Sequence, residues 1–211
     1  MLAQTLDLEN YTANVRRIVS GASGKNSSWL PPSLLGIQRD FANQRRAIRA
    51  GAGSLHLQFE GVELPPDVAL TESYLDEGNW QLARHFARQM NRHLGNQSLS
   101  TTQRQLTTAL SLLAEQDTKA LDLIRRVASG NSAETRIARE MLLRSLVLLG
   151  RTDEAIQVLQ SFGVEFVEEK AGKLFFAPPF DRLHVKEEFK AVVSEVIGIS
   201  KYDTAMATVK K

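Results

Sequence analysis

The sequence predicts an all-α protein: a short solenoid of three helical hairpins, with a helical N-terminal extension and a C-terminal capping segment. Apolar residues recur at the spacing of one helix face along most of the 211 residues. Glycines or short polar turns separate these runs. One pattern also repeats three times, with Ala83, Ala120 and Ala155 in equivalent places, 37 and 35 residues apart.

The predicted organisation has three parts, which cover residues 1–65, 66–163 and 164–211. In the first part, apolar spacing predicts a helix over 4–19, and a serine-rich polar linker follows it. A second helix is expected over 31–51, because two prolines suit its start and a glycine its end. Residues 54–66 alternate apolar and polar side chains, which predicts an extended segment or a short strand.

The middle part reads as six consecutive helices. They are expected at 66–77, 79–94, 100–116, 118–129, 133–149 and 152–162. The breaks between them fall at Gly78, Gly95, Asp117, Gly130 and Gly150. Because these connections are short, each helix is expected to run antiparallel to its neighbour.

The three repeated segments are "LTESYLDEGNWQLARHFARQM" (70–90), "TTALSLLAEQDTKALDLIRRV" (107–127) and "LLRSLVLLGRTDEAIQVLQSF" (142–162). Each joins an apolar first helix to a second helix with an early alanine, whose small side chain lets the two helices pack closely. This pattern resembles the tetratricopeptide repeat, a helical hairpin of 34 residues. The resemblance implies degenerate copies, because the closing proline is missing. The family's small residue in the first helix is replaced by Thr71, Thr108 and Leu143.

The third part begins with alternating apolar residues, which predict a hairpin-like extended segment over about 164–176. Two prolines then introduce a last helix, expected at about 185–198. Residues 200–211 are expected to fray.

The stretch "FDRLHVKEEF" (180–189) resembles the closing segment of repeat domains attached to bacterial regulators and signalling enzymes. In that family a pattern FxPLRxDPRF leads into a short capping helix. The matching apolar anchors are Phe180, Leu183 and Phe189, whereas Lys186 and Glu187 replace the acidic–proline pair. The resemblance implies that this segment covers the last apolar face of the solenoid.

The composition is that of an ordinary globular protein, with 43% apolar and 24% charged residues and a net charge of +2. The absence of cysteine excludes disulfides, thiolate metal sites and a cysteine nucleophile. The N-terminus carries Asp7 and Glu9 and has no long apolar run, so neither a signal peptide nor a membrane span is expected. We therefore expect a cytoplasmic protein.

The sequence contains no signature of a catalytic or cofactor site: HExxH, GxSxG, GxGxxG and GxxxxGK[ST] are all absent. His85 and His93 lie two helical turns apart with no third ligand nearby, so no metal site is expected. Paired carboxylates such as Asp76 and Glu77 fall at predicted turns or helix starts. We expect a protein without enzymatic activity, cofactor or metal.

Two groups of arginines form candidate basic patches. They are Arg39, Arg45, Arg46 and Arg49 in the second predicted helix, and Arg84, Arg88 and Arg92 along one stripe of a later helix. A solvated helix face is the favoured interpretation, and a site for phosphate or for an acidic protein is the alternative. Aromatic residues that could stack on bases are not interleaved with them, so nucleic acid is not the favoured partner.

The resemblance to the tetratricopeptide repeat implies that the first helix of each hairpin lines a concave, partner-binding face. Carried over by position, the lining residues are Val68, Glu72, Leu75, Gln105, Ala109, Leu112, Glu140, Arg144 and Val147. This mixed set, apolar with few charges, favours a helical or extended apolar peptide. The N-terminal region of the chain itself is the alternative occupant.

The favoured function is therefore a non-enzymatic protein–protein interaction module, an adaptor or a sensory scaffold, that binds a protein or peptide partner. A secretion or assembly chaperone could use the same groove. A nucleic-acid-binding regulator could use the arginines instead. The pattern leaves homo-oligomerisation open.

Overall fold

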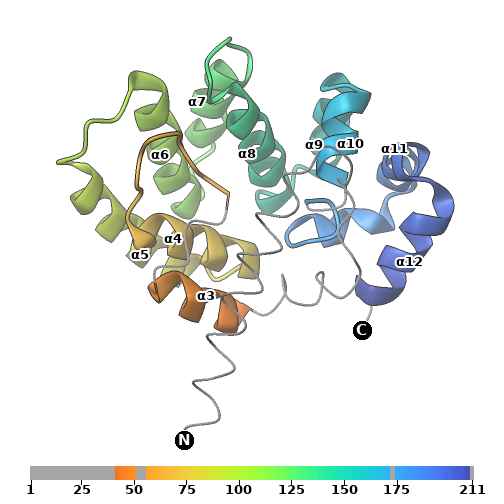
Figure 1. Cartoon of the computed structure of the whole chain (residues 1–211), viewed down its shortest axis with the longest axis horizontal. Coiled ribbons are helices and arrows are strands. Elements are labelled where there is room, and N and C mark those ends of the chain that lie inside the picture. Colours follow the sequence, from red (N-terminus) through yellow and green to blue (C-terminus); the bar gives the residue numbers. More distant parts are fainter. Residues whose placement is uncertain (1–40, 51–55, 172–173, 210–211) are drawn as a thin grey trace, which may run out of the picture.

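The computed structural model describes residues 41–50, 56–171 and 174–209. In this part of the chain the structure is all-α, and helices that follow one another in sequence pack side by side in an arc (Figure 1). This confirms the predicted fold class. The predicted helix over 4–19 and the first part of the helix over 31–51 lie outside the described residues.

Three helical hairpins form the centre of the arc. They are α4 (Pro66–Glu77) with α5 (Trp80–Leu94), α6 (Thr101–Ala114) with α7 (Lys119–Ala128), and α8 (Thr135–Leu148) with α9 (Thr152–Ser161). Their ends agree with the predicted ranges to within about two residues, the usual uncertainty of a helix boundary. The periodicity of the sequence therefore predicted these six helices correctly.

Glycines end the first helices of two hairpins by adopting a left-handed conformation. Gly78 has a φ of 81°, and its N–H donates to the carbonyl of Leu75 at the end of α4. Asn79 then caps α5, because its side chain accepts the backbone N–H of Leu82. Gly150, with a φ of 76°, makes the same reversal between α8 and α9. A residue with a Cβ would be strained at either position.

The three aligned alanines lie where the paired helices meet. Ala83, Ala120 and Ala155 are 0%, 0% and 1% exposed. Their burial confirms the prediction that these alanines are buried, and the need for a small side chain there stays a prediction. The arrangement of the helices is compatible with a helical-repeat fold.

Helix α3 (Phe41–Arg49) packs against the first hairpin. Its buried residues Ala47 and Ile48 face the apolar side of α4, where Ile48 clusters with Ala69 and Leu70. The last part of the predicted 31–51 helix is therefore a helix in the structure.

The C-terminal part contains four further helical elements. They are α10 (Val164–Ala171), the 3-10 helix η1 (Phe180–Val185), α11 (Glu187–Ile197) and α12 (Ile199–Val209). η1 lies against α8, and α11 lies against α9 and α10. The anchors Phe180, Leu183 and Phe189 are all buried, as the sequence predicted.

Two predictions for the C-terminal part were wrong. The segment expected to be extended over 164–176 begins with a helix instead. Its neighbours Phe166 and Val167 are both buried, which a helix allows and a half-buried strand does not, because successive strand residues face opposite sides. Residues 199–209 form α12 rather than fraying, because Tyr202 and Ala205 on one side of it are buried, and residues 210–211 lie outside the described part.

A polar contact inside an aromatic cluster holds α12 in place. The buried ring of His184 donates from Nε2 to the carbonyl of Phe175 at 2.8 Å and accepts at Nδ1 from the Tyr202 hydroxyl at 2.7 Å. Phe176 stacks on the same ring with centroids 4.8 Å apart. Both ring nitrogens thus have a hydrogen-bond partner.

In the described part of the chain, none of the helices combines the length and the apolar character needed to cross a membrane.

Candidate functional site

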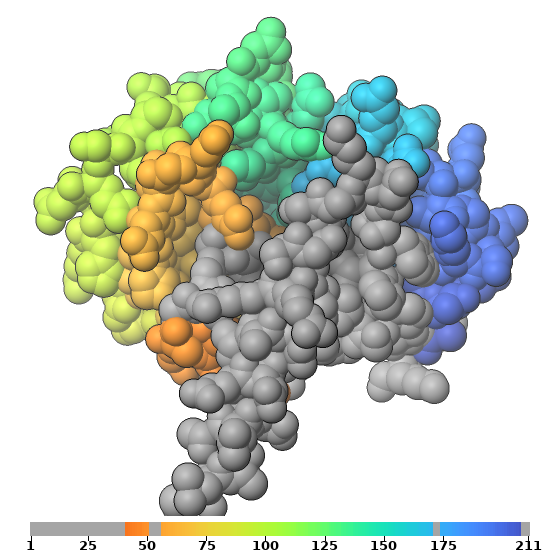
Figure 2. Space-filling model, viewed as in Figure 1, coloured from red at the N-terminus to blue at the C-terminus, as the bar shows by residue number. Residues whose placement is uncertain are grey.

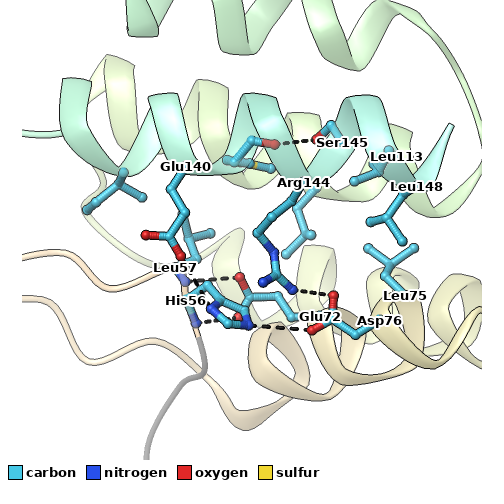
Figure 3. Close-up of a pocket in the computed structure, with 13 residues that line it drawn as sticks. His56, Leu57, Glu72, Leu75, Asp76, Leu113, Glu140, Arg144, Ser145 and Leu148 are labelled. Atoms are coloured by element: carbon cyan, nitrogen blue, oxygen red, sulfur yellow. Dashed lines mark hydrogen bonds and ion pairs between the residues drawn. The ribbon is translucent and has the colours of Figure 1, made fainter. Parts of the chain in front are cut away.

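The first helices of the three hairpins, α4, α6 and α8, surround a small cavity of about 20 Å³ (Figure 3). We call the surface around it the inner face. Its residues are Glu72, Leu75, Asp76, Leu110, Leu113, Ile137, Glu140, Met141, Arg144, Ser145 and Leu148. The cavity is just large enough for about one water molecule.

An extended stretch of the chain, His56–Phe59, completes the cavity and lies on the inner face. We call it the 56–59 segment. Its Leu57 and Phe59 side chains are buried, with 2% and 5% of their surface exposed, whereas Gln58 between them is exposed. This alternation matches the predicted extended segment. A turn with Gly61 at a φ of 71° then leads the chain towards α4.

The backbone of the 56–59 segment is bound by one carboxylate. Glu72 of α4, itself only 7% exposed, accepts the backbone N–H of His56 at 3.1 Å and that of Leu57 at 2.9 Å. Burial raises the pKa of the Glu72 carboxyl, although the charges of His56 and Arg144 oppose that rise. A buried backbone N–H outside a helix or sheet needs another acceptor, and the Glu72 carboxylate provides one for both of these N–H groups.

The side chain of His56 lies between two further carboxylates. Nε2 is 3.4 Å from Asp76 of α4, and Nδ1 is 3.4 Å from Glu140 of α8. Burial and the nearby Arg144 lower the pKa of His56, but the two carboxylates outweigh them and raise it to about 9. His56 is therefore a cation at neutral pH.

Arg144 of α8 joins the opposite sides of the inner face. Its Nη2 donates to Asp76 of α4, and both side chains are almost fully buried, with 7% and 5% exposed. Its Nη1 is buried and has no hydrogen-bond partner in the described part of the chain. An Arg–carboxylate pair this deep needs good geometry to offset the loss of hydration.

Lys170 extends the network to α10. Its ammonium is 2.9 Å from Glu140, which already contacts His56. Burial by itself would raise the pKa of Glu140, but His56, Lys170 and Arg144 together lower it to about 2. We call these side chains the ionic cluster: His56, Glu72, Asp76, Glu140, Arg144 and Lys170.

The structure brings four of the predicted concave-face residues together around the cavity. They are Glu72, Leu75, Glu140 and Arg144. On α6 the face is displaced by one residue, because Leu110 and Leu113 line the cavity in place of Ala109 and Leu112.

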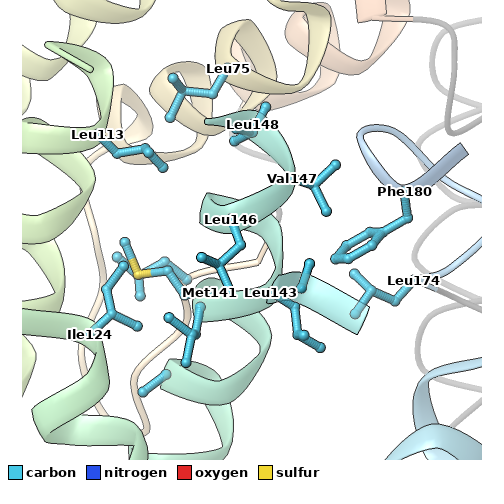
Figure 4. Close-up of a cluster of buried hydrophobic side chains, with 14 of the residues drawn as sticks. Leu75, Leu113, Ile124, Met141, Leu143, Leu146, Val147, Leu148, Leu174 and Phe180 are labelled. Atoms are coloured by element: carbon cyan, nitrogen blue, oxygen red, sulfur yellow. The ribbon is translucent and has the colours of Figure 1, made fainter. Parts of the chain in front are cut away.

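The other predicted lining residues lie elsewhere. Gln105 and Leu112 are partly buried, and Val68 and Ala109 are fully buried, with 0% exposed. Val147, which is 3% exposed, lies beside Phe180 of η1, among the apolar residues that join α8 to the C-terminal cap (Figure 4).

Three residues of the cluster, His56, Asp76 and Lys170, were not predicted. Asp76 was assigned to a turn, but it is 4% exposed and pairs with Arg144. Its position four residues after Glu72 was the available signal, because residues four apart share a helix face. The position of His56 in an alternating segment gave no comparable indication.

Three of the six described arginines of the predicted basic patches have an acidic partner. Arg45 contacts Glu77 at 3.0 Å and lies 4.4 Å from the centre of the Tyr74 ring. Arg84 and Arg88 share the carboxylate of Glu115, at 3.2 and 3.4 Å. The side chains of Arg46, Arg49 and Arg92 are exposed, and Arg39 lies outside the described residues.

The surface of the described part is continuous from the first hairpin to the C-terminal helices (Figure 2).

Comparison with known proteins gives no further assignment. No protein-family model matches this chain, and neither a curated protein nor a solved structure is significantly similar to it.

Proposed function

We propose that this chain is a non-enzymatic protein-interaction module of the tetratricopeptide-like kind, which binds an extended peptide on its inner face. The observation that supports it is the 56–59 segment, an extended stretch of chain held there by its backbone and by alternate side chains. Protein modules that recognise extended peptides use these two kinds of contact.

The details of this contact favour a peptide over other ligands. Glu72 accepts two consecutive backbone N–H groups, a feature that every peptide without proline offers. The buried Leu57 and Phe59 show that the surface takes large apolar side chains at alternate positions. An adaptor, a sensory scaffold and an assembly chaperone would all use such a surface, in the cytoplasm as the sequence suggests.

A role in binding nucleic acid has less support. Arg45, Arg84 and Arg88 each contact a carboxylate, so their charge is partly neutralised. A protein that binds phosphates loses affinity steeply as salt rises, whereas burial of apolar side chains depends little on salt.

Selection of unstructured peptides from a displayed random library, with the intact protein as the target, tests the proposal. A selected peptide carrying a photo-reactive diazirine should cross-link to residues of α4, α6 and α8, and its affinity should change only a few-fold between about 50 and 200 mM salt. Cross-links confined to α5, α7 and α9, or failure to select any peptide, would contradict the proposal. If the affinity falls steeply as salt rises, and the double variant Arg84→Glu/Arg88→Glu abolishes this dependence, the peptide binds at these arginines instead of the inner face.

A further inference from the structure

The 56–59 segment occupies the inner face as a ligand would, with a distinct contact at each position. We propose that it is an internal stand-in for the partner. The partner is then an extended peptide with a cationic residue at its first position and large apolar residues at its second and fourth, and it displaces the segment. This inference rests on the proposed function and names the class of peptide.

The first position favours a positive charge. The ring of His56 lies 3.4 Å from a carboxylate on each side, Asp76 of α4 and Glu140 of α8. Both carboxylates are largely buried, so a cation placed between them is attracted with little screening by solvent. An occupant of this position should therefore carry a positive charge.

The second and fourth positions require large apolar side chains. Leu57 lines the same cavity as Leu75, Leu110 and Leu113, and Phe59 belongs to the same hydrophobic core. The side chain at the third position is exposed, so burial sets no size there. Proline is excluded from the first two positions, since their N–H groups both donate to Glu72.

The segment is well suited to being exchanged, because its contacts come from groups that a matching peptide also has. Neither its backbone bonds to Glu72 nor its ion pairs depend on how the segment is joined to α4. A peptide in solution has to compete with a segment tethered at high effective concentration. Its apparent affinity is therefore reduced by the fraction of molecules in which the inner face is open.

The test uses the peptide HLQFEGVE, which is the sequence of residues 56–63, and measures its binding to the intact protein by calorimetry. The variant Leu57→Ala weakens the internal segment and leaves the inner face unchanged. It should bind the peptide at least tenfold more tightly than the wild type does. Glu60→Ala, which changes an exposed residue of the turn next to the segment, is the matched control and should bind it as the wild type does.

Altered peptides test the pattern itself. Replacing the histidine by alanine, or the leucine by proline, should weaken binding to the Leu57→Ala protein at least tenfold. Replacing the histidine by arginine, or the glutamate at the fifth position by alanine, should change it less than threefold. Equal binding of all these peptides would overturn the proposed class.

A second measurement covers the case in which Leu57→Ala does not fold. The chain has no cysteine, so Glu60→Cys provides a single labelling site on the exposed turn next to the segment. Excess HLQFEGVE should lower the fluorescence anisotropy of a dye at this site, as the segment is released. An unchanged anisotropy while the peptide is bound would overturn displacement.

The remaining outcomes separate this inference from the proposed function. If library peptides of another pattern bind the inner face and HLQFEGVE binds neither protein, the inference fails and the proposed function stands. If no peptide binds at all, both fail. A dimer that dissociates on adding HLQFEGVE would assign the site to a second copy of the chain and overturn the proposal.

Discussion

Arg144 on α8 forms a buried ion pair with Asp76 on α4, 68 residues earlier in the chain. The pair connects the first hairpin directly to the third, across the inner face. Both residues also contribute to the environment of His56, so the 56–59 segment is held by side chains from two hairpins. The stability of the solenoid and the occupancy of its inner face are thus linked.

Removing one partner of this pair should be strongly destabilising. Arg144→Met removes the guanidinium that hydrogen-bonds to the buried Asp76 and leaves His56 beside it, which should lower the free energy of unfolding by about 3 kcal/mol. Arg88→Met is the matched control, because the side chain of Arg88 is 70% exposed beside Glu115, and it should change stability by less than about 1 kcal/mol. Urea denaturation measures both. Equal effects would mean that the buried pair is not formed in solution.

The alanine at each hairpin crossing should resist enlargement. Ala155→Leu adds three carbons at a site that is 1% exposed, and overpacking of this kind lowers stability by about 1–3 kcal/mol. The same change at the exposed Ala191 of α11 should leave the melting temperature unchanged. A normal melting temperature for Ala155→Leu would contradict the close packing of α8 and α9.

The pH dependence of stability should report the charge of His56. Its pKa is about 9 in the folded protein against 6.5 in the unfolded chain, so its contribution is complete below pH 6.5 and is lost as the pH rises through 9. The difference in unfolding free energy between wild type and His56→Gln should therefore shrink by on the order of 2–3 kcal/mol between pH 6 and pH 10. A difference that stays constant over this range would show that the ring is not held by Asp76 and Glu140.

The hydroxyl of Tyr202 should be needed to fix α12. Tyr202→Phe leaves the buried Nδ1 of His184 without its donor, which should lower stability by about 1–3 kcal/mol. Hydrogen exchange in Ile199–Val209 should become faster, whereas the exposed change Asp203→Asn on the same helix should leave it unaltered. Unchanged protection of α12 in Tyr202→Phe would contradict this role.

The sequence predicted those features that are determined by residues close together along the chain. The six central helices follow from apolar spacing and from turn residues such as Gly78 and Gly150, and the buried alanines follow from the repeat. α10 was missed because "VEFVEEKA" alternates over too few residues to separate a strand from a helix. The prediction of α10 failed because the alternating pattern is short, and not because of the types of residue in it.

The ionic cluster was harder to predict because its partners are far apart in sequence. Glu72, Glu140 and Arg144 were placed on the inner face from the repeat pattern alone. The spacing from Glu72 places Asp76 on the same helix face, but no local pattern indicates that Asp76 pairs with Arg144 or that His56 lies between two carboxylates. Such contacts depend on the register between hairpins, which on α6 differs by one residue from the repeat alignment.

The exchange of the Leu57 amide proton tests the central claim most directly, because this N–H donates to Glu72 when the segment is in place. In the free protein it should exchange more than about tenfold slower than in an unstructured chain. Saturation with HLQFEGVE should raise the rate to that of an unstructured chain, as the peptide replaces the segment on Glu72. A Leu57 amide that stays protected while the peptide is bound would contradict the account.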